Sequence, residues 1–220
     1  MQCIKDTIKN INIVIGCSIG CSYCYARMNN NRFHTIDDFN KPVFFENKLK
    51  MLDNKRHTAY LLTGQSDLSG WNEEWKDKVF SKMKENENTQ YIFLTKRPEN
   101  IKLKETPDNG WFGVTATSSK EKTRIDYLRN NIKAKHYHIT FEPMFDDVGK
   151  LDLSNISWIV IGTETGNRKG KISSKREWVF NIYNQAKEKN IPAFMKEELL
   201  GILKEDEFVQ EFPKEFGGIE

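Results

Sequence analysis

The sequence predicts an α/β fold: an open partial (β/α) barrel of six to seven mostly parallel strands. Short runs such as YIFLT (residues 91–95) and WIVIG (residues 158–162) are almost continuously apolar, as in strands buried on both faces of a parallel sheet. Amphipathic helical segments alternate with these runs. The chain has 220 residues, fewer than the roughly 250 of a complete eight-stranded barrel, so an open barrel is expected.

The expected strands each end in small or polar residues: Ile11–Gly16, Ala59–Thr63, Tyr91–Thr95, Trp111–Thr117, His136–Phe141, Trp158–Gly162 and Pro192–Lys196. Helices are expected where apolar residues recur every three or four positions: Val43–Leu52, Glu73–Lys84, Lys120–Asn131 and Arg176–Lys189. No Pro/Gly linker or repeat breaks this alternation. Residues 1–220 are therefore predicted to form a single domain, with a core of about 11–198 and a C-terminal extension at 199–220.

The composition limits the class of protein. Hydrophobic residues make up 38% of the chain and charged residues 30%, which suits a folded domain with a well-solvated surface. The net charge of +3 neither demands nor excludes an anionic partner. No apolar run reaches the roughly 18–20 residues of a membrane span, and the N-terminus lacks the apolar stretch of a signal peptide. We therefore expect a cytoplasmic protein without a membrane partner, whose thiols stay reduced.

Three of the four cysteines lie within eight residues, directly after the first expected strand: Cys17, Cys21 and Cys24. This crowding favours a metal or cluster site over disulfides. A structural zinc site needs four ligands, and the remaining candidates, Cys3 and His34, do not have a zinc-type spacing. An ordinary ferredoxin cluster also takes four cysteines, so three would leave one iron of a 4Fe–4S cluster open to a small molecule.

The spacing C-x3-C-x2-C, with Tyr23 before the last cysteine, resembles the radical S-adenosylmethionine (radical SAM) superfamily. Further segments are similar to phage- and mobile-element-associated radical SAM proteins, above all to radical SAM mobile pair protein B: LLTGQSDLSGW, FLTKRP, WFGVTAT, HYHITFEPMFDD, WIVIGTETG and IPAFMKEEL. The resemblance implies a 4Fe–4S cluster on Cys17, Cys21 and Cys24, with S-adenosylmethionine (SAM) as the second cofactor.

The activity implied by the resemblance is reductive cleavage of SAM to a 5′-deoxyadenosyl radical, which abstracts hydrogen from an unidentified substrate. Such an enzyme needs an electron donor such as flavodoxin or ferredoxin. The mobile pair proteins are encoded beside a second radical SAM protein, which is therefore an expected partner.

The loops that follow the strands supply the other candidate residues, because the carboxyl ends of parallel strands meet at one edge. The resemblance implies that Tyr23 packs near the adenine of SAM. A stretch after the second strand, where the family usually has a Gly-Gly-Glu-like sequence, is a candidate for SAM binding: Thr63, Gly64, Gln65 and Ser66. This departure leaves the partner of the SAM amino group open. Helix capping by Ser66 or Asp67 is the alternative interpretation.

Later strand ends carry the candidates for cofactor contact and catalysis. Lys96, beside Arg97, and Thr115, beside Thr117, are expected to meet the SAM carboxylate or an anionic substrate group, with a solvated strand end as the alternative. The remaining candidates are implied by the resemblance: Glu142 at the ribose, Gly162 and Thr163 near adenine, Glu164 facing substrate, and Lys196, either catalytic or bridging to Glu142 or Glu164. Of His136 and His138, one is expected to point inward as a core histidine.

A basic segment, NRKGKISSKR (residues 167–176), carries five cations and no acid. It favours a nucleic acid or nucleotide as the substrate, although a mobile lysine-containing loop would have the same composition. A second hypothesis, from a different functional class, is a non-catalytic iron–sulfur or zinc-binding protein that acts as a sensor or binding module.

Overall fold

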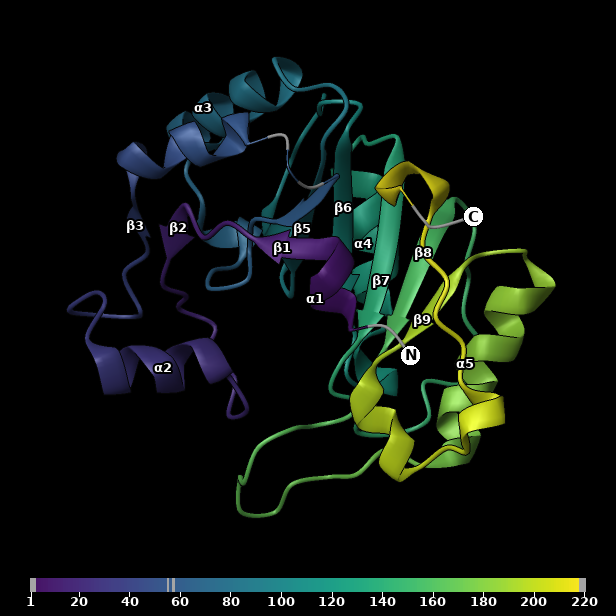
Figure 1. The fold of residues 1–220 in the computed structure, drawn as a ribbon. Coiled ribbons are helices and arrows are strands. Elements are labelled where there is room, and N and C mark those ends of the chain that lie inside the picture. Colours follow the sequence, from purple (N-terminus) through teal and green to yellow (C-terminus); the bar gives the residue numbers. More distant parts are fainter. Residues whose placement is uncertain (1–2, 55, 57, 218–220) are drawn as a thin grey trace.

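The computed structural model describes residues 3–54, 56 and 58–217, and within them seven strands form one curled parallel sheet (Figure 1). The strands in sheet order are Ile8–Asn10 (β1), Ala59–Leu61 (β4), Gln90–Thr95 (β5), Gly110–Thr115 (β6), His136–Phe141 (β7), Ile156–Ile161 (β8) and Ala193–Met195 (β9). All neighbouring pairs are parallel. Since β1 and β9 stand at opposite edges of the sheet, the predicted open partial α/β barrel is confirmed.

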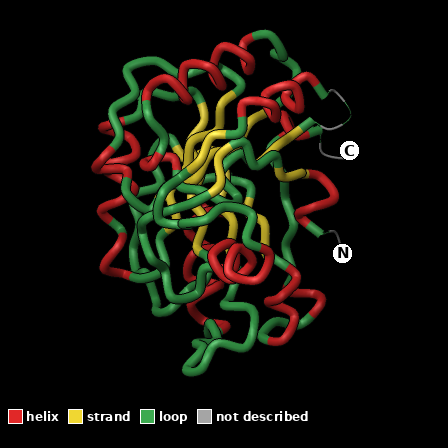
Figure 2. Tube along the Cα trace, turned by 90° about the vertical axis from the view of Figure 1, so that its left-hand side faces the viewer, coloured by secondary structure: helices red, strands yellow, loops and turns green. Residues whose placement is uncertain are grey.

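Three α-helices connect successive strands and cover the outer side of the sheet: Glu73–Lys84 (α3), Thr123–Asn131 (α4) and Arg176–Glu188 (α5). Each buries an apolar stripe, such as Val79 and Met83 of α3, in one large hydrophobic cluster. The side chain of Asn72 begins α3 by accepting a hydrogen bond from the Trp75 amide at 2.8 Å. Figure 2 shows the strands at the centre, surrounded by helices and loops.

Side chains on each strand alternate between two hydrophobic clusters. On β5, Phe93 packs in the large cluster beneath the helices, whereas Ile92 faces the concave side of the sheet. The cluster on the concave side, here called the inner cluster, consists of Ile8, Ala59, Ile92, Trp111, Trp158, Val160, Phe194 and Phe216. It fills the interior of the half-barrel.

The C-terminal segment closes the amino-terminal end of the half-barrel. The Phe216 ring packs edge-on against Trp111, with 4.7 Å between the ring centroids. Its carbonyl accepts a hydrogen bond from the hydroxyl of Thr58, the residue before β4, at 2.6 Å. The segment expected to be an extension is thus packed into the inner cluster, opposite the carboxyl ends of the strands.

The prediction of a first sheet strand at Ile11–Gly16 was wrong. The sheet strand is β1, and Val14–Ile15 (β2) instead pairs antiparallel with Val43–Phe44 (β3) in a separate two-stranded sheet. Ile13 and Val14 are completely buried. The apolar run therefore indicated burial correctly, but burial does not specify the strand with which a buried segment pairs.

The helix predicted at Val43–Leu52 was also wrong, since β3 is followed there by a 3₁₀-helix, Glu46–Asp53. Two interactions hold the start of this segment in extended form: the Phe45 amide donates to the Ile13 carbonyl at 2.8 Å, and Phe44 stacks on Trp75. Two α-helices of the described residues were not predicted, Ile4–Thr7 (α1) and Tyr25–Phe33 (α2). The ends of the other predicted strands and helices agree with the observed ends to within three residues.

No helix in the described part of the chain is long and apolar enough to cross a membrane.

Candidate functional site

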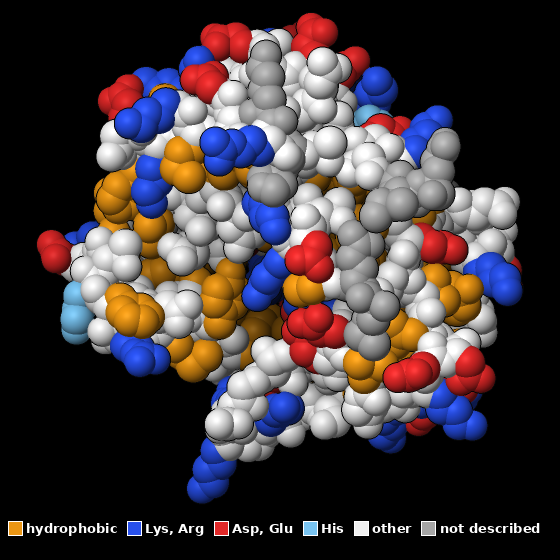
Figure 3. All heavy atoms as spheres, in the orientation of Figure 1, with side chains coloured by type: hydrophobic (Ala, Val, Ile, Leu, Met, Phe, Trp, Pro, Cys, Tyr) orange, Lys and Arg blue, Asp and Glu red, His pale blue; other side chains and the backbone are white. Residues whose placement is uncertain are grey.

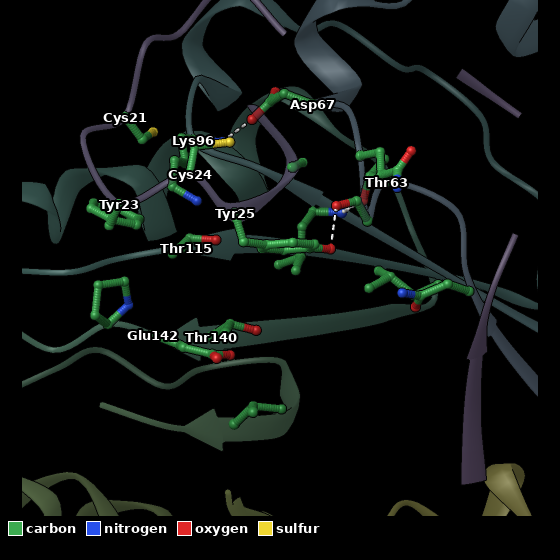
Figure 4. A pocket seen from close by; sticks show the side chains of 18 of the residues that line it. Cys21, Tyr23, Cys24, Tyr25, Thr63, Asp67, Lys96, Thr115, Thr140 and Glu142 are labelled. Atoms are coloured by element: carbon green, nitrogen blue, oxygen red, sulfur yellow. Dashed lines mark hydrogen bonds between the residues drawn. The ribbon is translucent and has the colours of Figure 1, made fainter. Parts of the chain in front are cut away.

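A pocket of about 450 Å³ opens where the strands end and extends down to the inner cluster. Figure 3 shows a hollow lined by hydrophobic side chains on this face, and Figure 4 shows the pocket from close by. Its wall combines the three-cysteine loop with the loops after β4, β5, β7, β8 and β9. The chain therefore gathers most of the predicted candidates around one cavity, as expected for the carboxyl edge of a parallel sheet.

All three cysteines of the loop line this pocket, and all are half-buried free thiols. The Cys24 sulfur caps α2 by accepting from the Arg27 amide at 3.4 Å, and the Cys17 sulfur accepts from the Ile19 amide at 3.5 Å. Burial raises the pKa of the Cys17 thiol, and the charges of Asp67, Cys21 and Cys24 raise it further, against the effect of the Ile19 amide. The thiols are thus close enough to influence one another electrostatically.

Gly16 turns the chain from β2 into this loop. Its φ of +114° is unfavourable for other residues, and a Cβ there would lie 2.9 Å from the Pro42 Cα. The Gly16 amide donates to the Gln65 carbonyl at 3.0 Å, and the Cys17 amide donates to the Phe39 carbonyl at 2.6 Å. The first cysteine is therefore anchored to two separate segments of the chain.

The predicted SAM-binding stretch after β4 lines the pocket, and four of its oxygen atoms already accept hydrogen bonds from within the protein. The Thr63 hydroxyl accepts from the Leu94 amide at 2.7 Å, and the Gly64 carbonyl accepts from the Tyr25 hydroxyl at 2.6 Å. The Gln65 carbonyl accepts from Gly16, and the Ser66 hydroxyl accepts from the Trp71 indole at 3.0 Å. These contacts give the stretch a clear role in shaping the pocket.

Asp67 is the capping residue that the alternative interpretation foresaw. Its buried carboxylate accepts hydrogen bonds from the Ser69 amide at 2.9 Å, the Thr95 hydroxyl at 2.7 Å and the Lys96 amide at 2.8 Å. It therefore caps the 3₁₀-helix Leu68–Gly70 and ties the end of β5 to the loop after β4.

Tyr23, Lys96 and Thr115 lie on the cysteine side of the pocket (Figure 4). The Lys96 ammonium nitrogen is 5.8 Å from the Tyr23 ring centroid, and the Tyr23 ring meets Phe145 edge-on at 5.4 Å. Burial, together with the nearby Cys21 charge, raises the pKa of the Tyr23 phenol, so the ring stays neutral. Two neighbouring candidates do not line the pocket: Arg97 is exposed, and the Thr117 hydroxyl binds Glu121.

Lys196 forms an ion pair with Glu142 in the pocket wall and lies 3.6 Å from a second carboxylate, Glu198. Burial lowers the pKa of Lys196, but the Glu142 and Glu198 carboxylates together outweigh this effect, and the net result is a raised pKa. Gly162 lies behind the pair, where a Cβ would come within 3.1 Å of Glu142 and 3.2 Å of Lys196. Of the two bridges considered for Lys196, the structure has the one to Glu142.

Glu164 is almost completely buried, and Arg168 binds it through two nitrogens at 2.5 and 2.8 Å. This guanidinium lowers the pKa of the Glu164 carboxyl despite the opposing effect of burial. The Ile172 amide adds a third hydrogen bond, and the Thr163 hydroxyl accepts from the Ser174 amide at 3.1 Å. Both predicted residues border the pocket, but they also hold the base of the long loop at the bottom of Figure 1.

His138 lies on the inner wall of the pocket, deeper than the strand ends. Its Nε2 is 3.1 Å from the Phe93 carbonyl on β5, so the imidazole spans β6. Complete burial lowers the pKa of His138 to about 4, which keeps the ring neutral. His136 stacks on Trp111 at 4.3 Å instead.

The depressed pKa of His138 predicts a loss of stability in mild acid. Because the unfolded chain binds a proton near pH 6.5 and the folded chain only near pH 4, the stabilisation is complete above the unfolded value and declines as the pH falls towards 4. We expect the free energy of unfolding to drop by about 2 kcal/mol between pH 7 and pH 5. Urea denaturation of the metal-free protein and of His138→Gln measures this, and equal pH dependence in both would contradict it.

Several pocket residues were not predicted: Asn10, Tyr25, Thr140 and Glu198. Tyr25 had a usable signal, because it directly follows Cys24 at the start of a helix. Glu198, two residues after Lys196, had none beyond its position after the last strand. Asn10 lies on β1, which was itself assigned to the wrong residues.

Comparison with known proteins matches the family described as "Protein of unknown function (DUF5131)" over residues 2–218. No curated protein and no solved structure matches the chain. The identification with the radical SAM superfamily and radical SAM mobile pair protein B was therefore wrong: the family that matches almost the whole chain is a different one. In addition, the described residues contain no group of three or more His, Cys, Asp or Glu side chains arranged to hold a metal ion.

Proposed function

The chain belongs to the DUF5131 family, and we propose that it is an enzyme that binds a 4Fe–4S cluster on Cys17, Cys21 and Cys24 and SAM in the adjoining pocket. The observation that carries the proposal is that three free thiols line one pocket together with the polar ends of five strands. The proposal rests on these donors and on the pocket, and not on membership of another family.

The donor set suits a cluster better than a single ion. In a 4Fe–4S cluster each thiolate binds a different iron, so the sulfurs stand farther apart than the ligands of one tetrahedral ion at Zn–S distances of about 2.3 Å. The three thiols line one pocket, and the described residues include no group arranged to hold a single metal ion. Cys3 does not line the pocket, and its sulfur lies 3.8 Å from Glu197.

The surroundings of the thiols also suit an anionic cluster. Backbone amides of Ile19 and Arg27 donate to Cys17 and Cys24, and amide hydrogen bonds to sulfur are one of the ways in which proteins tune cluster potentials. The Arg27 Nε is buried without a hydrogen-bond partner among the described residues. The Nη2 of the same guanidinium donates to the Cys17 carbonyl, so its charge lies next to the first cysteine. A cation at this place is compatible with a negatively charged group bound by the three cysteines.

When bound, the reduced cluster would supply one electron to the SAM sulfonium, giving methionine and a 5′-deoxyadenosyl radical that takes a hydrogen atom from the substrate. The protein side chains would bind and orient the cofactor. Lys96 offers a cation to the SAM carboxylate, and Tyr23 offers a neutral aromatic face. Glu142, held in place by Lys196, offers a carboxylate oxygen to the ribose hydroxyls. The apolar inner cluster limits water at the pocket floor.

For the substrate we propose a nucleic acid or nucleotide. The loop at residues 167–176 projects beside the pocket and carries Lys and Arg side chains (Figures 1 and 3). Arg168 and Arg176 pair with Glu164 and Glu207, and this reduces the free positive charge expected from the sequence. Lys171 donates to the Gly166 carbonyl at 3.4 Å, and the Lys175 ammonium lies 5.2 Å from the centroid of the Trp178 ring. Among the described residues neither of them, nor Lys169, is paired with a carboxylate, so we propose that these three lysines bind phosphates.

The proposed function is tested by anaerobic reconstitution with iron and sulfide, followed by reduction with dithionite in the presence of SAM. We expect about four irons per chain and the release of 5′-deoxyadenosine and methionine, both measured by chromatography. An electron donor such as flavodoxin or ferredoxin should replace dithionite. A fully loaded cluster that binds SAM and yields no 5′-deoxyadenosine would contradict the enzyme, and stoichiometric zinc in place of iron would favour a binding module.

The same reaction with single-stranded and double-stranded DNA and RNA, and with mononucleotides, tests the substrate class. Stimulation of 5′-deoxyadenosine formation that falls with salt would support phosphate recognition by the loop. Charge reversal at Lys169 and Lys171 should weaken that stimulation. Absence of any effect from all these additions would remove nucleic acids and nucleotides from consideration while leaving the cluster proposal intact.

A further inference from the structure

Arg27 is attached to both ends of the three-cysteine loop. Its Nη2 donates to the Cys17 carbonyl at 2.7 Å, and its backbone amide donates to the Cys24 sulfur at 3.4 Å. The guanidinium carbon lies 5.0 Å from the centroid of the Phe39 ring, which belongs to the hydrophobic cluster beneath the loop. One residue of α2 thus fixes the first and the last cysteine relative to each other.

The Nε of the Arg27 side chain has no such partner. Arg27 Nε is buried, and within the described residues it makes no hydrogen bond. Buried donors without an acceptor are uncommon because their desolvation is not compensated. Arg32, five residues further along α2, differs in this respect, since its guanidinium stacks on the exposed Phe33 ring.

We propose that Arg27 is a positioning residue for the cluster: it ties the Cys17 carbonyl to the helix that Cys24 caps, and it places a positive charge next to the first cysteine. This inference rests on the proposed function. The guanidinium reaches the cysteine backbone and leaves its ligand sulfurs free. Residues that orient ligands in this way, without binding the metal themselves, commonly change metal affinity by about 10–100-fold when they are replaced.

The test compares Arg27→Gln, Arg27→Lys and the control Arg32→Gln after reconstitution. Arg27→Gln removes the charge and the guanidinium that donates to the Cys17 carbonyl. We therefore expect a chelator to remove the cluster about tenfold faster than from the wild type, and the reduction potential to be more negative. Arg27→Lys keeps the charge and loses the guanidinium. It should lose the cluster faster as well, but with a potential close to that of the wild type. Arg32→Gln should match the wild type in both measurements.

Failure of this inference is distinguishable from failure of the proposed function. If the wild type takes up no iron, the proposed function fails. If the wild type loads fully and Arg27→Gln retains its cluster at the wild-type rate and potential, the role of Arg27 is overturned while the cluster stands. Circular dichroism of the metal-free variants checks folding. Should Arg27→Gln not fold, wild-type cluster retention in Arg27→Lys would overturn the inference.

Discussion

Replacing any one of Cys17, Cys21 and Cys24 by alanine is expected to abolish the visible absorption of the reconstituted protein and to reduce its bound iron at least tenfold. All three thiols line the same pocket, and the sequence offers only Cys3 as a fourth thiol, which does not line that pocket. Two thiolates leave two irons of a 4Fe–4S cluster without protein ligands, so the cluster should not survive desalting. Absorption spectra and iron analysis of the desalted variants measure the effect.

Cys3→Ala provides the matched control, because it removes a half-buried thiol outside the pocket. It should retain the wild-type iron content and spectrum. Loss of the cluster in Cys3→Ala would identify Cys3 as the missing fourth ligand and would favour a closed, non-catalytic site. Unchanged iron content in all three loop variants would contradict a cluster on this loop.

The sequence predicted the sheet well where burial and periodicity agreed. The strand β7 and the helix α3 were predicted with their observed ends, because each apolar pattern is long and matches a single period. The helix α2 was missed for the opposite reason. It exposes Tyr25, Met28 and Phe33 and buries Asn30, whose side chain binds the backbone of Ile36 in both directions. Its large apolar side chains are exposed and a polar one is buried, so the usual rule that apolar positions face the core does not identify this helix.

The sequence predicted the position of the candidate site more accurately than the contacts of its individual residues. Parallel topology brings loops that are distant in sequence to one edge, so residues such as Cys24, Lys96 and Glu142 could be grouped in advance. Their individual partners could not be. Glu164 pairs with Arg168, four residues away in an irregular loop, and no periodicity predicts such a contact. Likewise, nothing in the sequence connects Arg27 to the carbonyl of Cys17.

Gly113→Ala is expected to destabilise the protein by about 3 kcal/mol, because the strand β6 has no room for a side chain at this position. A Cβ on Gly113 would lie 2.4–2.5 Å from three atoms of the His138 ring. That ring is completely buried and crosses β6 to reach the Phe93 carbonyl, so it cannot move aside without losing the hydrogen bond. Urea denaturation of the metal-free protein measures the free energy of unfolding without involving any cofactor.

Two further variants decide whether the collision with His138 is the cause. Gly201→Ala is the control, because a Cβ there meets no atom within 4 Å, and its stability should change by less than about 1 kcal/mol. In the double variant Gly113→Ala/His138→Ala the obstructing ring is absent. Its destabilisation should therefore fall short of the sum of the two single changes by about 1–3 kcal/mol. Strict additivity would show that the imidazole does not lie over Gly113, and the inner wall of the pocket would then differ from the one described.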